Sequence, residues 1–210
     1  LSYTTNKFIE SGQAFFVRAS GAPGTVSFNE NAKTSGSSTP FRTSLSSTVS
    51  TRINCQLKQL INTETILLDG LVAEFGTDLI NGIDAMDAYK FKQTNESISI
   101  NSYNTELAVE RRRFPENNDS IFLKLTNLKV RQYQLCFTGI NLSRWEMVPL
   151  LYDRYLDSHH PIDLNQGTTI SFYVSQDAAS YSPDRFAIVF KQRAADYPPA
   201  EYSYTDIRIR

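Results

Sequence analysis

The sequence of 210 residues lacks most of the features that identify a protein class directly. It has 21 Lys and Arg against 22 Asp and Glu, and this formal charge of −1 gives no electrostatic reason to expect a nucleic-acid partner. It has no run of about 18 apolar residues, so we expect no membrane span. Its two cysteines are too few for a disulfide scaffold. The sequence therefore has neither the excess of one charge nor the cysteine content that would indicate a particular class of partner or scaffold.

Recognisable catalytic motifs are also missing. The sequence has no glycine-rich phosphate loop, no Gly-x-Ser-x-Gly elbow and no paired-cysteine metal motif. Its only histidines are the neighbours His159 and His160, followed by Pro161. Neighbouring side chains of an extended chain point to opposite sides, so this pair is poorly suited to chelate one ion, and we expect both in an exposed turn. We therefore predict that the chain is not an enzyme, and a hydrolase whose acids converge only in the folded state is the least favoured hypothesis.

What the sequence does have is aromatic and β-branched residues that recur with a period of two. Aromatic residues make up 12% of the chain. Apolar and polar residues alternate in four runs bounded by Gly, Asn, Asp and Pro clusters, namely residues 15–19, 122–126, 169–174 and 186–191. Such alternation is typical of strands with one buried and one wetter face. The sequence therefore predicts an all-β fold, an antiparallel, jelly-roll-like β-sandwich with little helix.

Two segments show some helical spacing of apolar residues, at residues 56–66 and 145–156. Pro149 interrupts the second, and neither combines a capping residue with a long periodic face. We expect both to be mainly strand and turn.

Changes in composition divide the chain into four parts. Residues 1–33 are predicted to form a β-hairpin, turning at residues 21–24, that docks on the main body because an isolated hairpin is barely stable. Residues 34–51 are a loop or linker, since 12 of the 18 residues from 34 to 51 are Ser or Thr. Residues 52–191 are the sandwich, and residues 192–210 lead towards a following domain. Because the first residue is Leu1 and no leader follows it, we expect a processed product or a piece of a larger protein.

The two cysteines are predicted to face opposite sides of the sheet. Cys55 is in phase with the apolar Ile53 and Leu57, whereas Cys136 is out of phase with Leu135 and Phe137. A buried thiol and a surface thiol are therefore favoured over a disulfide, which stays the alternative.

Asp84 and Asp87 form the best carboxylate cluster. Closely spaced oxygen ligands can hold calcium, the one cofactor that the sequence suggests, but the alternating acidic pattern of a calcium-hand loop is missing. The favoured alternative is that both carboxylates accept backbone N–H groups and cap a turn.

Two further groups of residues are candidates for binding a sugar or a nucleic acid. Trp145, Tyr152 and Tyr155 form a candidate sugar-stacking platform, although aromatic residues at strand spacing are more often core. The basic run at residues 111–113 is too short for a nucleic-acid footprint. We expect these arginines to cover a strand end and to pair with acids such as Glu110 and Glu116.

Several phrases taken together resemble modules of large surface proteins that bacteria export through the type IX (Por) secretion system. They are residues 9–19 (IESGQAFFVRA), 107–112 (LAVERR), 119–125 (DSIFLKL), 150–156 (LLYDRYL) and 184–190 (DRFAIVF). The resemblance spans residues 8–191 in the same order, although Cys136 stands where a polar residue is usual. Such modules lie near the C-terminus, just ahead of the sorting domain, and have no catalytic motif to carry over. The resemblance implies an extracellular or outer-cell-surface location.

The favoured hypothesis is a non-catalytic extracellular β-sandwich module that serves as a spacer or adhesion element of a multidomain protein. Its expected partners are neighbouring domains of the same polypeptide, and a glycan or another surface partner. The alternative is a carbohydrate-binding module stabilised by calcium.

Overall fold

The computed structural model describes residues 21–32, 51–140 and 147–192. The chain divides into two compact units, residues 1–48 and 49–210, which are treated separately. In the first unit, residues 21–32 are largely extended, contain no strand and end in the 3₁₀ helix η1 (Glu30–Ala32). The rest of the hairpin predicted for residues 1–33 lies outside the described residues, as does almost all of the predicted linker (34–51) and exit segment (192–210). These three assignments stay predictions.

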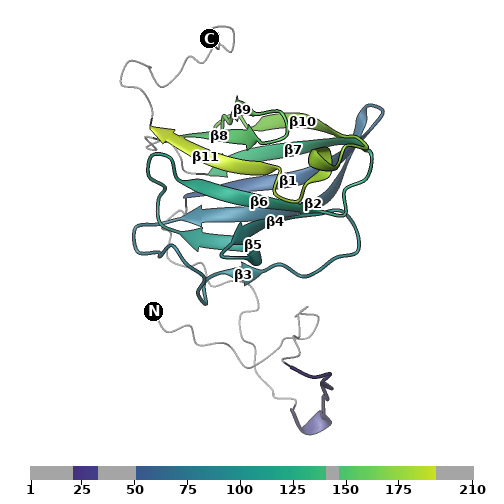
Figure 1. The fold of residues 1–210 in the computed structure, drawn as a ribbon. Coiled ribbons are helices and arrows are strands. Elements are labelled where there is room, and N and C mark those ends of the chain that lie inside the picture. The colour runs from purple at the N-terminus through teal and green to yellow at the C-terminus, as the bar shows by residue number, and fades with distance from the viewer. Residues whose placement is uncertain (1–20, 33–50, 141–146, 193–210) are drawn as a thin grey trace. The chain divides into compact units, whose positions relative to one another are not determined.

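The second unit, called the sandwich here, is built from strands (Figure 1). Its described residues contain no α-helix and one 3₁₀ turn, η2 (Ala178–Tyr181). The strands are β1 (Thr51–Ile61), β2 (Glu64–Phe75), β3 (Ala88–Tyr89), β4 (Ser97–Ser102), β5 (Thr105–Arg112), β6 (Ser120–Thr126), β7 (Arg131–Ile140), β8 (Met147–Asp153), β9 (Ser158–Pro161), β10 (Thr168–Val174) and β11 (Phe186–Gln192). The predicted all-β fold class is confirmed.

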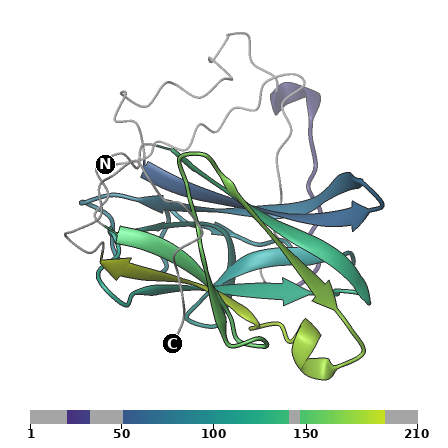
Figure 2. The same ribbon diagram turned by 90° about the horizontal axis from the view of Figure 1, so that it is seen from above.

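The strands are hydrogen-bonded in the order β10-β7-β1-β2-β5-β4-β6-β11-β8-β9, with β3 added beside β5. All these pairs are antiparallel except β2 with β5, which run parallel where Val72–Phe75 lies beside Val109–Arg112. This pair is a departure from the purely antiparallel arrangement expected. The sheet folds over on itself, so that Phe75 of β2 meets Phe190 of β11 and Phe172 of β10 meets Phe186 of β11. Figure 2 shows the β1–β2 hairpin in one layer and β11 in the other.

The core lies between these layers and follows the predicted alternation. On β11, Phe186, Ile188 and Phe190 are buried, and on β6 the buried residues are Ile121, Leu123 and Leu125. On β10 the burial pattern also alternates, although Ile170 is only partly buried. Since the sequence had already marked these positions by their period of two, local pattern and burial agree.

Both segments with weak helical spacing are strands. Residues 56–66 contain the end of β1, a two-residue turn and the start of β2, and Asn62 in this turn has φ of 55°. Asn tolerates this left-handed conformation better than other side chains, which favours a tight hairpin here. Within residues 145–156, β8 extends from Met147 to Asp153 with Pro149 facing inward.

One irregularity in β5 has a consequence for charged residues. Leu107 and Glu110, three positions apart, are both buried, because the pairing with β3 shifts by one residue: Tyr89 lies opposite Leu107, whereas Ala88 lies opposite Val109. One extra residue in a strand reverses the alternation, so the side chains that follow it point to the opposite face from the one expected. Glu110 therefore turns into the end of the core. The strand continues two residues beyond Glu110 and ends at Arg112.

The cysteines lie as predicted. Cys55 on β1 is fully buried and Cys136 on β7 is partly exposed, and both are free thiols. Cys136 is paired in register with Gln56, the neighbour of Cys55, so the two thiols face opposite sides. Burial raises the pKa of the Cys55 thiol well above its ordinary value, and the nearby Cys136 raises it further.

Candidate functional site

The two carboxylates considered for calcium hold their own loop. Asp84 Oδ1 accepts a hydrogen bond from the Met86 amide at 2.7 Å, and Asp87 Oδ2 accepts one from the Asp84 amide at 2.9 Å. Asp87 Oδ1 also accepts from the amide of Arg111 on β5, at 2.7 Å. These contacts are those of a turn cap, and they attach the loop to the sheet. Among the described residues, no group of three or more His, Cys, Asp and Glu side chains gathers as a metal site.

Tyr152 lies in a row of side chains across the outer face of one layer. The register places Phe122 of β6 opposite Ala187 of β11, Ala187 opposite Tyr152 of β8, and Tyr152 opposite His159 of β9. Tyr152 and His159 stack with their ring centres 4.5 Å apart. The Tyr152 hydroxyl donates to Asp157, and this hydrogen bond raises the pKa of the phenol. This set, Phe122, Tyr152 and His159, is called the aromatic row below.

Tyr155 belongs to a different surface. Its ring lies 4.8 Å from the guanidinium of Arg185, at the end of the core, and it is partly exposed. Trp145, the third member of the predicted platform, lies outside the described residues. The structure therefore separates Tyr152 from Tyr155 and adds Phe122 and His159 beside Tyr152. The partners come from other strands, so only the strand register could have identified them.

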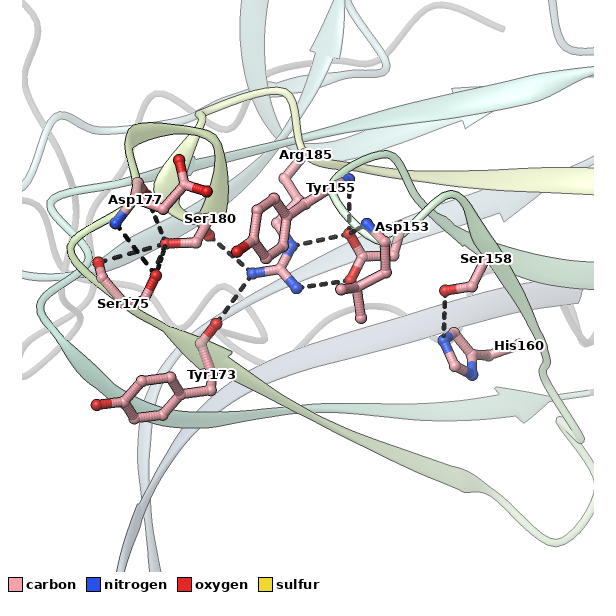
Figure 3. Close-up of polar contacts among 10 residues, drawn as sticks. Asp153, Tyr155, Ser158, His160, Tyr173, Ser175, Asp177, Ser180 and Arg185 are labelled. Carbon is pink, nitrogen blue, oxygen red and sulfur yellow. Dashed lines mark hydrogen bonds and ion pairs between the residues drawn. The ribbon is translucent and has the colours of Figure 1, made fainter.

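The guanidinium of Arg185 makes four hydrogen bonds to its neighbours (Figure 3). Its Nε and Nη2 donate to the two carboxylate oxygens of Asp153 at 2.8 and 2.6 Å. Its Nη1 donates to the carbonyl oxygens of Tyr173 and Ser180 at 3.1 and 2.7 Å. The side chains of Arg185 and Asp153 are only 2% and 3% exposed. Asp153 also accepts from the Tyr155 amide at 3.0 Å, so the pair ties the turn after β8 to the turn before β11.

A serine network continues from this ion pair into the loop that contains η2. The Ser180 hydroxyl, fully buried, donates to the carbonyl of Asp177 at 2.7 Å and accepts from the Ser175 amide at 3.0 Å. Asp177 in turn accepts from the Ala179 amide, which makes it the cap of η2. These hydroxyl groups form hydrogen bonds within the loop and so fix its shape.

The two histidines are on strand β9, which corrects the expected exposed turn. His159 points outward in the aromatic row, whereas His160 is partly buried. Ser158 Oγ and His160 Nε2 are 3.2 Å apart. Figure 3 marks this contact with a dashed line. A serine nucleophile needs a base that is itself oriented by a third group. In the described part of the chain no carboxylate is hydrogen-bonded to His160.

Two other carboxylates are strongly bound. Burial alone would raise the pKa of Asp69, but hydrogen bonds from Lys90, Ser97 and the amides of Ile98 and Gly70 outweigh it and lower the pKa. The Lys90 Nζ to Asp69 Oδ1 distance is 2.6 Å. For Glu96, burial is likewise outweighed by a backbone hydrogen bond and by nearby Arg131 and Lys129, so its pKa is lowered.

The predicted pairing of the basic run is confirmed only in part. Arg112 contacts Glu110 at 3.5 Å, as expected, but Arg111 pairs with Glu74 of β2 at 2.7 Å. Arg112 and Glu110 border a hollow of about 340 Å³ at the end of β4, β5 and β6. The inward turn of Glu110 depends on the irregularity in β5, which the alternation of the sequence does not reveal.

The part of the chain that the structure describes contains no helix with the length and hydropathy of a membrane span. No protein-family model, no curated protein and no solved structure matches this chain.

Proposed function

We propose that the chain is a non-catalytic extracellular β-sandwich module of a multidomain secreted or cell-surface protein, in which it acts as a spacer or adhesion element. The resemblance of five ordered segments to modules of type IX-exported proteins supports the outer-cell-surface location. The proposed partners are neighbouring domains of the same polypeptide.

The observation that carries the proposal is how the buried charges are used. Arg185 binds Asp153, Lys90 binds Asp69, and Arg131 binds Glu96 at 2.9 Å. A general acid or base must present its proton site to a substrate. Here the charged groups instead bind one another and loop backbone atoms, which suits a rigid module better than an enzyme.

The tip of the β1–β2 hairpin supports a contact with a neighbouring domain. Ile61 and Ile66 are exposed there on one face of the hairpin, next to the turn, and the exposed Leu67 lies on the opposite face. Grouped exposed apolar side chains mark interaction surfaces, and contacts between domains of one chain are commonly modest in area.

An exchange experiment tests this role. In the gene of the source organism, the segment for residues 51–192 is replaced by an unrelated β-sandwich of similar length. A spacer predicts unchanged surface level, cell attachment and enzymatic activity of the whole protein, and an adhesion element predicts loss of attachment alone. Hydrolysis of a polysaccharide or peptide by the purified chain would overturn the proposal.

Carbohydrate binding is the second candidate, and the aromatic row favours it. Aromatic rings on an exposed sheet face can stack against sugar rings, and Phe122 is 47% exposed. One face of Tyr152 is covered by His159, and the guanidinium of Arg154 lies over the Phe122 ring, 5.5 Å from its centre, so each ring has one face left for a sugar. A glycan array tests this candidate: binding that both Phe122→Ala and Tyr152→Ala weaken and Tyr173→Ala leaves intact would support it. Tyr152 belongs to the row alone, whereas Phe122 also borders a hollow at the end of β4, β5 and β6, and Tyr173 is exposed on β10 outside the row. An array without any bound polysaccharide would contradict it.

A further inference from the structure

We propose that the hollow at the end of β4, β5 and β6 is a binding site for a single neutral sugar residue. This inference goes beyond the spacer role and does not depend on it. The hollow is formed by the ends of β4 and β5 and the start of β6, and its lining includes Asn101, Ser102, Tyr103, Glu110, Arg112 and Phe122. Its volume of about 340 Å³ is near the lower end of ligand pockets, which span roughly 300–1,000 Å³. That size suits one sugar ring.

The first argument is that Arg112 is bound loosely for a buried cation. Its side chain is 11% exposed, and its contacts to Ser120 O, Glu110 Oε2 and Asp119 Oδ2 are 3.3, 3.5 and 3.8 Å long. Its buried Nε donates to no acceptor in the described part of the chain. Among the described residues, Arg52 Nε is the other buried side-chain nitrogen without a hydrogen-bond partner. Buried donors are almost always satisfied, so an exception calls for an explanation.

Arg185 shows what a purely structural arginine looks like in the same sandwich. Its four hydrogen bonds lie between 2.6 and 3.1 Å and engage Nε and both terminal nitrogens. The side chain of Arg112 is 11% exposed, against 2% for Arg185, makes only long contacts and borders a hollow. Nη2 of Arg112 makes only the 3.8 Å contact to Asp119 in the described part of the chain, so this nitrogen, and not the buried Nε, has hydrogen-bonding capacity left for a ligand.

The charges around the hollow favour a neutral ligand. Glu110 is 5% exposed, accepts from Ser102 Oγ at 2.9 Å and lies beside Arg112, while Asp119 adds a second carboxylate. An anionic ligand would meet these two carboxylates, and a cationic ligand would meet Arg112. Sugar hydroxyls both donate and accept, so they can donate to Glu110 and accept from Arg112 without adding charge.

The rim supplies the apolar surface that such a ligand needs. Tyr103 is 74% exposed and stands on the turn between β4 and β5, where Ser102 pairs with Thr105. Tyr103 and Asn104 have φ of 47° and 60°, the signature of a tight two-residue hairpin turn. This fixed backbone holds the tyrosine ring at the rim, where the C–H face of a sugar can pack against it.

Titrations of the ¹⁵N-labelled chain with neutral monosaccharides test the inference, using glucose, galactose, mannose and N-acetylglucosamine and following amide shifts. We expect saturable shifts at the amides of Asn101 and Tyr103 with at least one sugar and a Kd on the order of 1 mM. Tyr103→Ala, at an exposed position, and Ser102→Ala should each weaken binding by about tenfold. Tyr152→Ala, in the aromatic row, should leave it unchanged.

Three results would overturn the assignment. One is that none of the four sugars gives saturable shifts. Another is that the shifts survive Tyr103→Ala, which would place the binding elsewhere. The third is saturation by acetate or phosphate in place of every neutral sugar. None of these results bears on the spacer role, which the exchange experiment tests separately.

Discussion

The ion pair between Asp153 and Arg185 allows the sharpest prediction about stability. Substituting Asp153→Asn keeps the size of the side chain but removes the charge that compensates Arg185, whose guanidinium is almost fully buried. It also turns an amide group towards the guanidinium in place of one of the two accepting oxygens. Removing one partner of a buried ion pair typically lowers the free energy of unfolding by about 3–5 kcal/mol. For a domain of this size that corresponds to a fall in Tm of roughly 10 °C.

The assay is urea unfolding followed by tryptophan and tyrosine fluorescence, with a matched exposed pair as control. Glu106 and Lys124 are 2.8 Å apart, but their side chains are about a third exposed. Glu106→Gln should therefore lower the unfolding free energy by less than about 1 kcal/mol. If Asp153→Asn destabilises the protein no more than Glu106→Gln does, the description of Arg185 as a structural anchor is wrong.

Three further predictions concern other parts of the sandwich. Cys136 should react with a thiol reagent in the native protein, whereas Cys55 should react only on unfolding, because burial excludes the reagent and raises the pKa of the Cys55 thiol. Equal reaction rates of the two thiols in the native protein would contradict this. Asp87→Ala should lower the unfolding free energy by about 1–2 kcal/mol, because the amides of Asp84 and Arg111 lose their acceptor. Calcium should leave the Tm of the unmodified protein unchanged. A Tm that rises with calcium in the unmodified protein but not in the variant would restore the metal hypothesis. Asp69 has a folded-state pKa below its unfolded value of about 4, so its stabilising effect is present above that pH and is lost as the pH falls through the folded-state pKa. Asp69→Asn should consequently flatten the acid side of the stability profile, and an unchanged profile would show that Asp69 is not responsible.

The strands could be predicted because their burial is encoded locally. On β11 every second residue from Phe186 to Phe190 is apolar and buried, and a period of two needs no knowledge of the partner strand. The same reasoning placed Cys55 inward and Cys136 outward. The turn-capping alternative for Asp84 and Asp87 also rests on local chemistry, and the contacts bear it out.

Contacts between distant strands could not be predicted in the same way. Asp153 is in phase with the buried Leu151, so its inward orientation is visible in the sequence, but its partner Arg185 lies 32 residues away. The stacking of Tyr152 on His159 depends on the register of the β8–β9 hairpin. The inward turn of Glu110 depends on one extra residue in β5, which alternation alone does not mark. The Asp153–Arg185 ion pair, the aromatic row and the hollow are therefore visible only in the folded chain.

The most direct test of the proposed role is where the protein resides. Antibodies raised against residues 51–192 are applied to intact cells of the source organism and to lysed cells, with an antibody to a periplasmic protein as control. The account predicts that intact cells are labelled by the first antibody while the periplasmic control labels only lysed cells. Labelling that appears only after lysis would contradict an extracellular module.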